Sequence, residues 1–110
     1  MSPITTHILD TTLGKPASHV AIRLYQQQAT DWTELASGHT DDDGRIRDLL
    51  AEAIPSGIYK LRFETQAYFD RLGVASFYPF VEIIFSIKTG EHYHVPLLLN
   101  PFGFSTYRGS

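Results

Sequence analysis

The sequence predicts an all-β fold: a two-sheet sandwich of seven to eight short antiparallel strands with one short helix. Apolar and polar residues alternate with period two over most of the chain, turn residues separate the alternating runs, and one stretch breaks the period. The chain has 110 residues and shows no internal repeat or linker. We therefore expect a single domain over residues 1–110.

The first two strands follow from this alternation. Residues 4–10 read ITTHILD, in which Ile4, Thr6 and Ile8 alternate with Thr5, His7 and Leu9, and a Gly-Lys-Pro turn ends the run. Residues 19–26 read HVAIRLYQ and place Val20, Ile22 and Leu24 on one face. Each strand therefore has one face suited to a core and another free for solvent or a site.

A third strand, a turn and a fourth strand are expected next. Residues 31–38 read DWTELASG and precede the DDDG turn at residues 41–44. In such turns Asp side chains bond the local backbone, and Gly44 tolerates a positive φ. Residues 57–64 read GIYKLRFE and resume the alternation, with aromatic and aliphatic side chains opposite charged ones.

One stretch, residues 65–73, reads TQAYFDRLG and predicts a short helix instead of a strand. Thr65 can cap its start, and Gly73 can end it. The turn residues KTGE then separate two further alternating runs. The last strands are expected at residues 80–87, 92–100 and 104–109.

Composition excludes several classes of function. The formal net charge is −3 and Lys and Arg do not cluster, which argues against a nucleic-acid surface or an anionic membrane patch and favours small partners. The absence of cysteine excludes disulfides, a thiolate zinc site and a cysteine nucleophile. The N-terminus lacks signal-peptide features and no apolar run could span a bilayer, so a cytoplasmic location is expected.

Two histidines are expected on strand faces that point away from the core. The side chain of His7 is expected on the opposite face of its strand from the apolar Ile8. His94 is expected to share a face with His92 and Pro96. Histidine transfers protons readily near neutral pH, although a histidine can also merely cover the solvent side of a sheet. The His-Tyr-His spacing also permits a zinc site with His7 as third ligand. A proline within a strand lacks a ladder donor, so Pro96 is expected at an edge or a bulge.

Arginines and the C-terminal tip offer further candidates. Arg45 and Arg47 share a face in an extended chain, so one can clamp a substrate while the other forms a surface ion pair. The pattern does not choose between them. Tyr107, Arg108 and Ser110 form a tip that is either a frayed end or a segment held by a contact.

Four segments together resemble a known family. HVPLLL with the closing STYRGS, THILD, DDDGRI and YFDRLGVASFYPFVEI closely resemble the 5-hydroxyisourate hydrolases, the transthyretin-like enzymes of urate breakdown. The resemblance covers nearly the whole chain. The closing Tyr-Arg-Gly-Ser distinguishes these hydrolases from transthyretin, the hormone carrier of the same fold. The resemblance implies a transthyretin-like β-sandwich protomer in a homotetramer, with active sites at the dimer–dimer interface.

The resemblance also implies a reaction and its residues. The expected reaction is hydrolysis of 5-hydroxyisourate to 2-oxo-4-hydroxy-4-carboxy-5-ureidoimidazoline, with no metal and no other cofactor. By position, His7, Arg45, His94 and Ser110 resemble the catalytic set, and His7, Arg45 and Tyr107 the substrate-binding residues. The histidines would act as general base and general acid, in an order left open, and Arg45 would bind the substrate or the oxyanion. The alternatives are a transthyretin-like carrier without catalysis and a zinc-dependent hydrolase.

Overall fold

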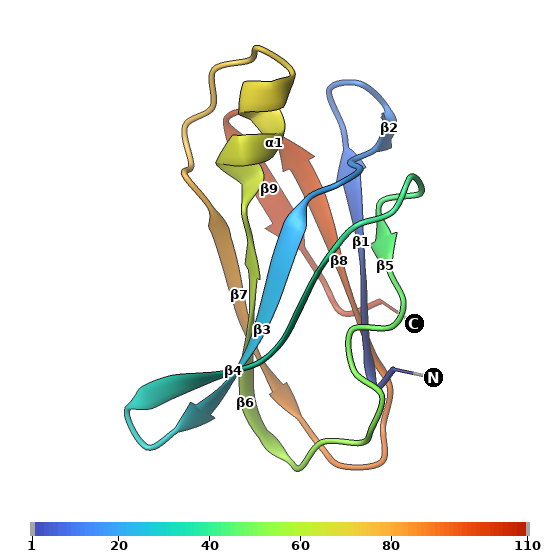
Figure 1. Ribbon diagram of the computed structural model, residues 1–110, viewed down its shortest axis with the longest axis vertical. Coiled ribbons are helices and arrows are strands. Elements are labelled where there is room, and N and C mark those ends of the chain that lie inside the picture. Colours follow the sequence, from blue (N-terminus) through green and yellow to red (C-terminus); the bar gives the residue numbers. More distant parts are fainter. Residues whose placement is uncertain (1, 110) are drawn as a thin grey trace.

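A computed structural model describes residues 2–109, which form two sheets packed face to face with a helix at one end (Figure 1). Sheet 1 contains β1 (Ile4–Asp10), β2 (Lys15–Pro16), β5 (Arg45–Ile46), β8 (Tyr93–Asn100) and β9 (Gly103–Thr106). Sheet 2 contains β3 (Ala21–Gln28), β4 (Asp31–His39), β6 (Gly57–Phe63) and β7 (Val81–Ile87). The helix α1 spans Thr65–Arg71 and follows β6.

The core lies between the sheets and uses the faces that the alternation identified. Ile8 of β1 and Leu97 of β8 are fully buried on the inner face of sheet 1, as are Leu24 and Leu61 on that of sheet 2. Burying each such side chain contributes about 1.5–3 kcal/mol before the entropy of ordering is subtracted. The outer faces are thereby left free for polar residues.

The prediction of a two-sheet sandwich with one short helix is confirmed, but one strand pair differs from the antiparallel expectation. β1 and β8 run parallel, with Ile4 opposite Tyr93 and Asp10 opposite Leu99. Alternation indicates that a segment is a strand, yet it carries no information on the direction of the neighbouring strand. The described residues form seven strands of four or more residues, together with two strands, β2 and β5, of two residues each.

The helix forms where expected, but its start differs from the prediction. Thr65 is the first helical residue, and its buried hydroxyl has no hydrogen-bond partner among the described residues, so it does not cap the helix. Gly73 ends the helix with a φ of +70°. The Tyr68 hydroxyl donates a hydrogen bond of 2.8 Å to the buried Asp10 carboxylate, which ties α1 to the end of β1. In residues 2–109, no helix is long and apolar enough to cross a membrane.

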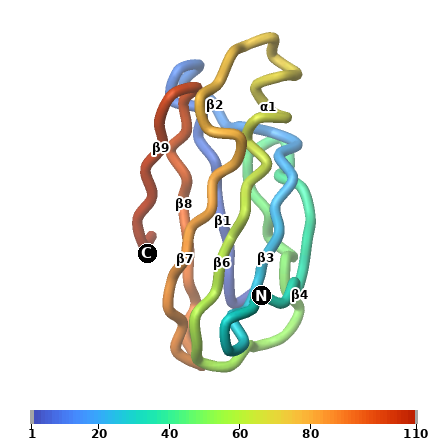
Figure 2. Tube along the Cα trace, turned by 90° about the vertical axis from the view of Figure 1, so that its left-hand side faces the viewer, coloured from blue at the N-terminus to red at the C-terminus, as the bar shows by residue number. Residues whose placement is uncertain are grey.

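Pro96 was expected at an edge or a bulge, and the edge is ruled out because the strand β8 is internal. β8 lies between β1 and β9, and β9 forms the outer edge (Figure 2). Pro96 instead marks a break in the ladder: pairing with β9 ends where Leu97 faces Thr106 and resumes at Gly109, whose N–H donates 2.8 Å to the His94 carbonyl. At the break the Thr106 hydroxyl donates to the Pro96 carbonyl at 2.7 Å.

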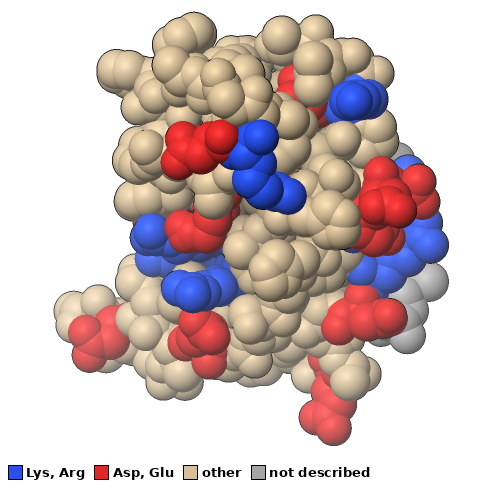
Figure 3. Space-filling view, turned by 45° about the horizontal axis from the view of Figure 1, so that its top comes forward, with Lys and Arg blue, Asp and Glu red and all other residues tan. Residues whose placement is uncertain are grey.

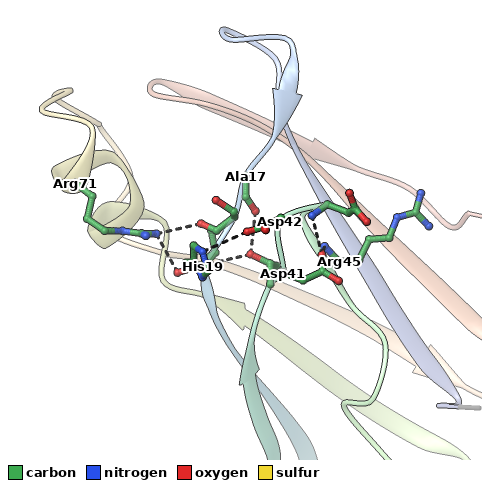
Figure 4. Close-up of polar contacts among 10 residues, drawn as sticks. Ala17, His19, Asp41, Asp42, Arg45 and Arg71 are labelled. Atoms are coloured by element: carbon green, nitrogen blue, oxygen red, sulfur yellow. Dashed lines mark hydrogen bonds and ion pairs between the residues drawn. The ribbon is translucent and has the colours of Figure 1, made fainter.

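The DDDG turn fixes the position of β5. The Asp41 carboxylate accepts hydrogen bonds from the backbone N–H groups of Asp43 and Arg45, at 2.9 and 3.0 Å (Figure 4). Gly44 has a φ of +73°, and its carbonyl accepts a 2.8 Å hydrogen bond from the N–H of Ile8 in β1. A Cβ atom on Gly44 would lie 2.6 Å from the Ile8 carbonyl oxygen, so only glycine fits without displacement.

Charged side chains of both signs are interspersed over the surface. On the face in Figure 3, acidic and basic groups lie beside one another instead of gathering by sign. On the outer face of sheet 2, Glu82 contacts both Lys60 and Arg62 at 3.4 Å. On the face in Figure 3, the described residues do not form a continuous stripe of basic side chains.

We predict that Gly44→Ala lowers the free energy of unfolding by at least about 2 kcal/mol, because a positive φ and a backbone clash combine there. Gly73→Ala is the matched control, since its φ of +70° is similar but a Cβ would meet nothing within 4 Å. The control should lose only about 1 kcal/mol. Urea denaturation measures both variants, and equal losses would contradict the proposed contact with Ile8.

Candidate active site

The outer face of sheet 1 brings together three of the residues that the sequence singled out. The strand register pairs His7 of β1 with Arg45 of β5, and Thr5 of β1 with His94 of β8. Directly paired residues extend their side chains from the same face of a sheet. His7 and His94 are both half-buried, so neither is a freely solvated surface histidine.

A groove of about 420 Å³ opens on this face. A groove of this volume suits a small polar molecule. It combines two imidazole rings and two guanidinium groups with a single carboxylate. Its lining residues are Thr5, Thr6, Arg45, Ile46, Arg47, Asp48, His92 and His94.

A hydroxyl group links the two histidines of the His-Tyr-His motif. The Thr5 hydroxyl lies 2.9 Å from Nδ1 of His94 and 3.2 Å from Nε2 of His92. The sequence placed both histidines on one face, which is confirmed, but it gave Thr5 no role and His92 none beyond the zinc alternative. Only the pairing of β1 with β8 brings Thr5 to His94, and no pattern within either strand indicates that pairing.

The surroundings of His94 lower the pKa of its imidazole. Burial is the largest cause, followed by the positive charges of Arg45, His7 and His92, while a hydrogen bond with Thr5 acts in the opposite direction. Each of the larger effects disfavours the imidazolium form. The neutral form of His94, which can accept a proton, is therefore favoured.

The structure distinguishes the two arginines that the sequence left equivalent. Arg47 lies 4.0 Å from the Asp43 carboxylate, and both side chains are largely exposed, so the pair adds little stability. Within residues 2–109, no carboxylate lies at ion-pair distance from Arg45. Its side chain points away from the Asp41 turn (Figure 4), which leaves the Arg45 guanidinium available to a ligand.

The tip beyond β9 is held in place over the residues that the structure describes. A Cβ atom on Gly109 would lie 2.6 Å from Cδ2 of His94, so this glycine packs directly against the imidazole ring. The Arg108 guanidinium lies 3.3 Å from the Glu91 carboxylate and 4.3 Å from the centre of the Tyr93 ring. Ser110 lies outside the described residues, so its catalytic role stays a prediction.

Tyr107 is not brought together with His7, Arg45 and His94 within one chain. It is exposed and lines a separate cavity of about 480 Å³ between β7 and the end of β9, with Ile84 among the other lining residues. The sequence could not indicate this separation, because it depends on how the chain leaves β9 after Thr106. The substrate-binding role of Tyr107 stays a prediction.

The described residues do not form a group of three His, Asp or Glu side chains that could hold a metal ion. His92 and His94 instead contact the same threonine hydroxyl. The zinc site that the histidine spacing permitted therefore has no assembled ligand set within residues 2–109.

Fold and site together define a transthyretin-like β-sandwich with a histidine and arginine site on one outer face. The chain belongs to the HIUase/Transthyretin family, whose profile matches residues 4–109. It is 49% identical over 109 residues to a 5-hydroxyisourate hydrolase of Salmonella dublin, a match that covers 97% of this chain and 80% of the relative.

Solved structures of both branches of the family are similar to this one. The Klebsiella pneumoniae 5-hydroxyisourate hydrolase superposes with a TM-score of 0.88 at 41% identity, covering 97% of this chain and 98% of that one. Sea bream transthyretin in complex with thyroxine superposes with a TM-score of 0.93 at 35% identity, covering 98% and 95%. The overall fold therefore does not separate enzyme from carrier, and the side chains of the site must do so.

We predict that Gly109→Ala displaces the His94 ring and lowers activity at least about tenfold, with little change in the free energy of unfolding. Gly103→Ala in β9 is the matched control, since its Cβ would make only ordinary contacts of 3.6 Å or more. Steady-state turnover and urea denaturation should be measured on both variants. Unchanged turnover of Gly109→Ala would contradict a positioning contact between Gly109 and His94.

Proposed function

We propose that the protein is an enzyme that hydrolyses 5-hydroxyisourate in urate breakdown. The observation that carries the proposal is the placement of His7, Arg45 and His94 on one outer face, where Arg45 and His94 line a groove. A paired acid and base suit hydrolysis and have no use in a passive carrier. The Arg45 guanidinium, which forms no ion pair within residues 2–109, adds a group that can bind an oxyanion. The 49% identity to a relative of that activity supports the same assignment.

The proposed chemistry opens a cyclic acyl-urea with water. A neutral imidazole removes a proton from water, whose oxygen forms a bond to the ring carbonyl carbon, and the carbonyl oxygen becomes an oxyanion. The C–N bond then breaks, and an imidazolium protonates the leaving nitrogen to give 2-oxo-4-hydroxy-4-carboxy-5-ureidoimidazoline. General base and general acid each typically contribute about 10²–10⁴-fold.

The charges around the site support an assignment of these roles. The lowered pKa of His94, caused first by burial and then by Arg45, suits it to act as the base. His7 is then the proton donor. Arg45 is always charged and forked, so it suits the oxyanion or paired carbonyl oxygens of the substrate. Ser110 would orient a histidine or the attacking water.

We infer that the functional form is a homotetramer with sites at the dimer–dimer interface. The position of Tyr107 outside the groove of its own chain supports a site completed by more than one protomer. Closed symmetry favours such an assembly. Sedimentation of the 12.4 kDa chain should therefore report a tetramer, and a monomer with full turnover would contradict the inference.

A carrier function is the second candidate, because sea bream transthyretin in complex with thyroxine has the same fold at 35% identity. A carrier would bind a small aromatic ligand in the channel between subunits without converting it. Turnover separates the two functions, since a carrier gives no acceleration of hydrolysis.

We predict that the protein accelerates the decay of 5-hydroxyisourate generated in situ from urate, as followed by ultraviolet absorbance. His94→Asn should lower turnover at least about 100-fold because it removes the base. His39→Asn is the matched control, since His39 is exposed at the end of β4 in the other sheet. No acceleration by the wild-type protein would refute the hydrolase assignment.

Turnover should depend on pH through His94. Its pKa lies below the ordinary value of 6.5, so the base form persists below that pH and activity is lost as the pH falls through the lowered pKa. Arg45→Met removes one cause of the shift and should raise the pKa of His94. NMR titration of the His94 ring measures this without turnover, and Arg47→Met is the control. An unchanged His94 titration in Arg45→Met would contradict the electrostatic coupling.

A further inference from the structure

The Thr5 hydroxyl lies between two imidazole rings, one half-buried in the site and one exposed to solvent. We propose that Thr5 and His92 form a proton relay that connects His94 to solvent and selects its tautomer. The proposal rests on the proposed function, in which His94 is the base. Thr5 and His92 are then positioning and relay residues that act through His94.

The relay follows from the hydrogen count of a hydroxyl group. A threonine hydroxyl carries one hydrogen, so it can donate to only one of the two ring nitrogens and must accept from the other. The contacts of 2.9 Å to His94 and 3.2 Å to His92 are both hydrogen bonds. The tautomers of His92 and His94 are therefore coupled through Thr5.

One of the two arrangements prepares His94 for catalysis. When Nδ1–H of His94 donates to Oγ1 of Thr5, the Thr5 hydroxyl donates to Nε2 of His92. The lone pair of His94 then lies on Nε2, the nitrogen directed away from Thr5. Without the threonine oxygen as acceptor, nothing in this chain of contacts would hold the proton on Nδ1.

The same chain of contacts can discharge His94 after it has taken a proton from water. The Nδ1 proton passes to Oγ1 of Thr5 while the hydroxyl proton passes to Nε2 of His92. One O–H bond forms as another breaks, so Thr5 is unchanged and the positive charge moves from His94 to His92. His94 is then neutral with its proton on Nε2. Exchange of protons with water, at Nε2 of His94 after the product leaves and at His92 through the same contacts, restores Nδ1–H for the next turnover.

Electrostatics gives the transfer its direction. His94 is half-buried, and it faces Arg45 from β5 and His7 from β1, so a positive charge on its ring is disfavoured. His92 is exposed at the mouth of the groove, where Asp48 is the only carboxylate among the lining residues and Arg47 is also present. Solvent can therefore accept the proton from His92.

The chemistry of the proposed reaction requires such a route. Hydrolysis of an acyl-urea yields a carboxylic acid, which is ionised at neutral pH. The acid proton restores the imidazolium of His7, which gave its own proton to the leaving nitrogen, so the proton that His94 took from water is the one released in each turnover. That proton must leave a half-buried site before the next turnover. Because Thr5 and His92 lie between His94 and the solvent, they provide a path that does not depend on the departing product.

Three variants test the relay. Thr5→Val removes the hydroxyl but keeps the shape and the β propensity, and it should lower kcat at least about tenfold with little change in KM. Thr5→Ser restores a hydroxyl and should recover most of the kcat. His92→Ala should be slow in dilute buffer and recover in concentrated imidazole buffer, which replaces the missing proton acceptor. His39→Ala is the matched control and should show neither loss nor rescue.

Nitrogen NMR of the imidazole rings supplies a readout that needs no turnover. In the wild-type protein, the His94 signals should report Nδ1–H, and Thr5→Val should shift both His94 and His92. Wild-type kcat in Thr5→Val, or spectra that do not respond to it, would overturn the relay, as would a slow His92→Ala that imidazole fails to rescue. Failure of the wild-type protein to act on 5-hydroxyisourate would instead overturn the proposed function, while the spectra still test the coupled tautomers.

Discussion

The parallel pairing of β1 with β8 is the constraint on which the rest of the site depends. It joins the first strand to a strand near the end of the chain and sets Thr5 opposite His94. β1 also pairs with the two-residue strand β5, which sets Arg45 opposite His7. A shift of β1 by one residue against β8 would turn His7 towards the core and expose Ile4 and Ile8, which now pack between the sheets.

The break in the ladder at Pro96 links the fold to the chemistry. Because proline donates no hydrogen bond, β9 cannot continue along β8, and the chain returns to it only at Gly109. Where the chain returns to β8, the backbone of Gly109, which has no side chain, packs against the His94 ring. The same ring is therefore packed by the tip on one side and hydrogen-bonded to Thr5, which leaves it little freedom to rotate.

Enzymes and carriers of this family share one β-sandwich fold, and the structure explains how one fold can support both functions. The core between the sheets uses only the inner faces, so residues on the outer face of sheet 1 can change without altering the packing. In this chain that face carries imidazole, guanidinium and hydroxyl groups. The proposed function therefore depends on a few outward side chains, whereas stability depends on the inward ones.

The sequence by itself determined which segments are strands, which face of each is apolar, and that His7 and His94 point away from the core, because period two is local and visible within one strand. Tertiary structure alone decided that β1 runs parallel to β8, that Thr5 touches His94 across 89 residues, and that Gly109 packs on the same ring. It also separated Tyr107 from the groove. These contacts join distant segments, and their geometry exists only once the backbone hydrogen bonds have fixed the register.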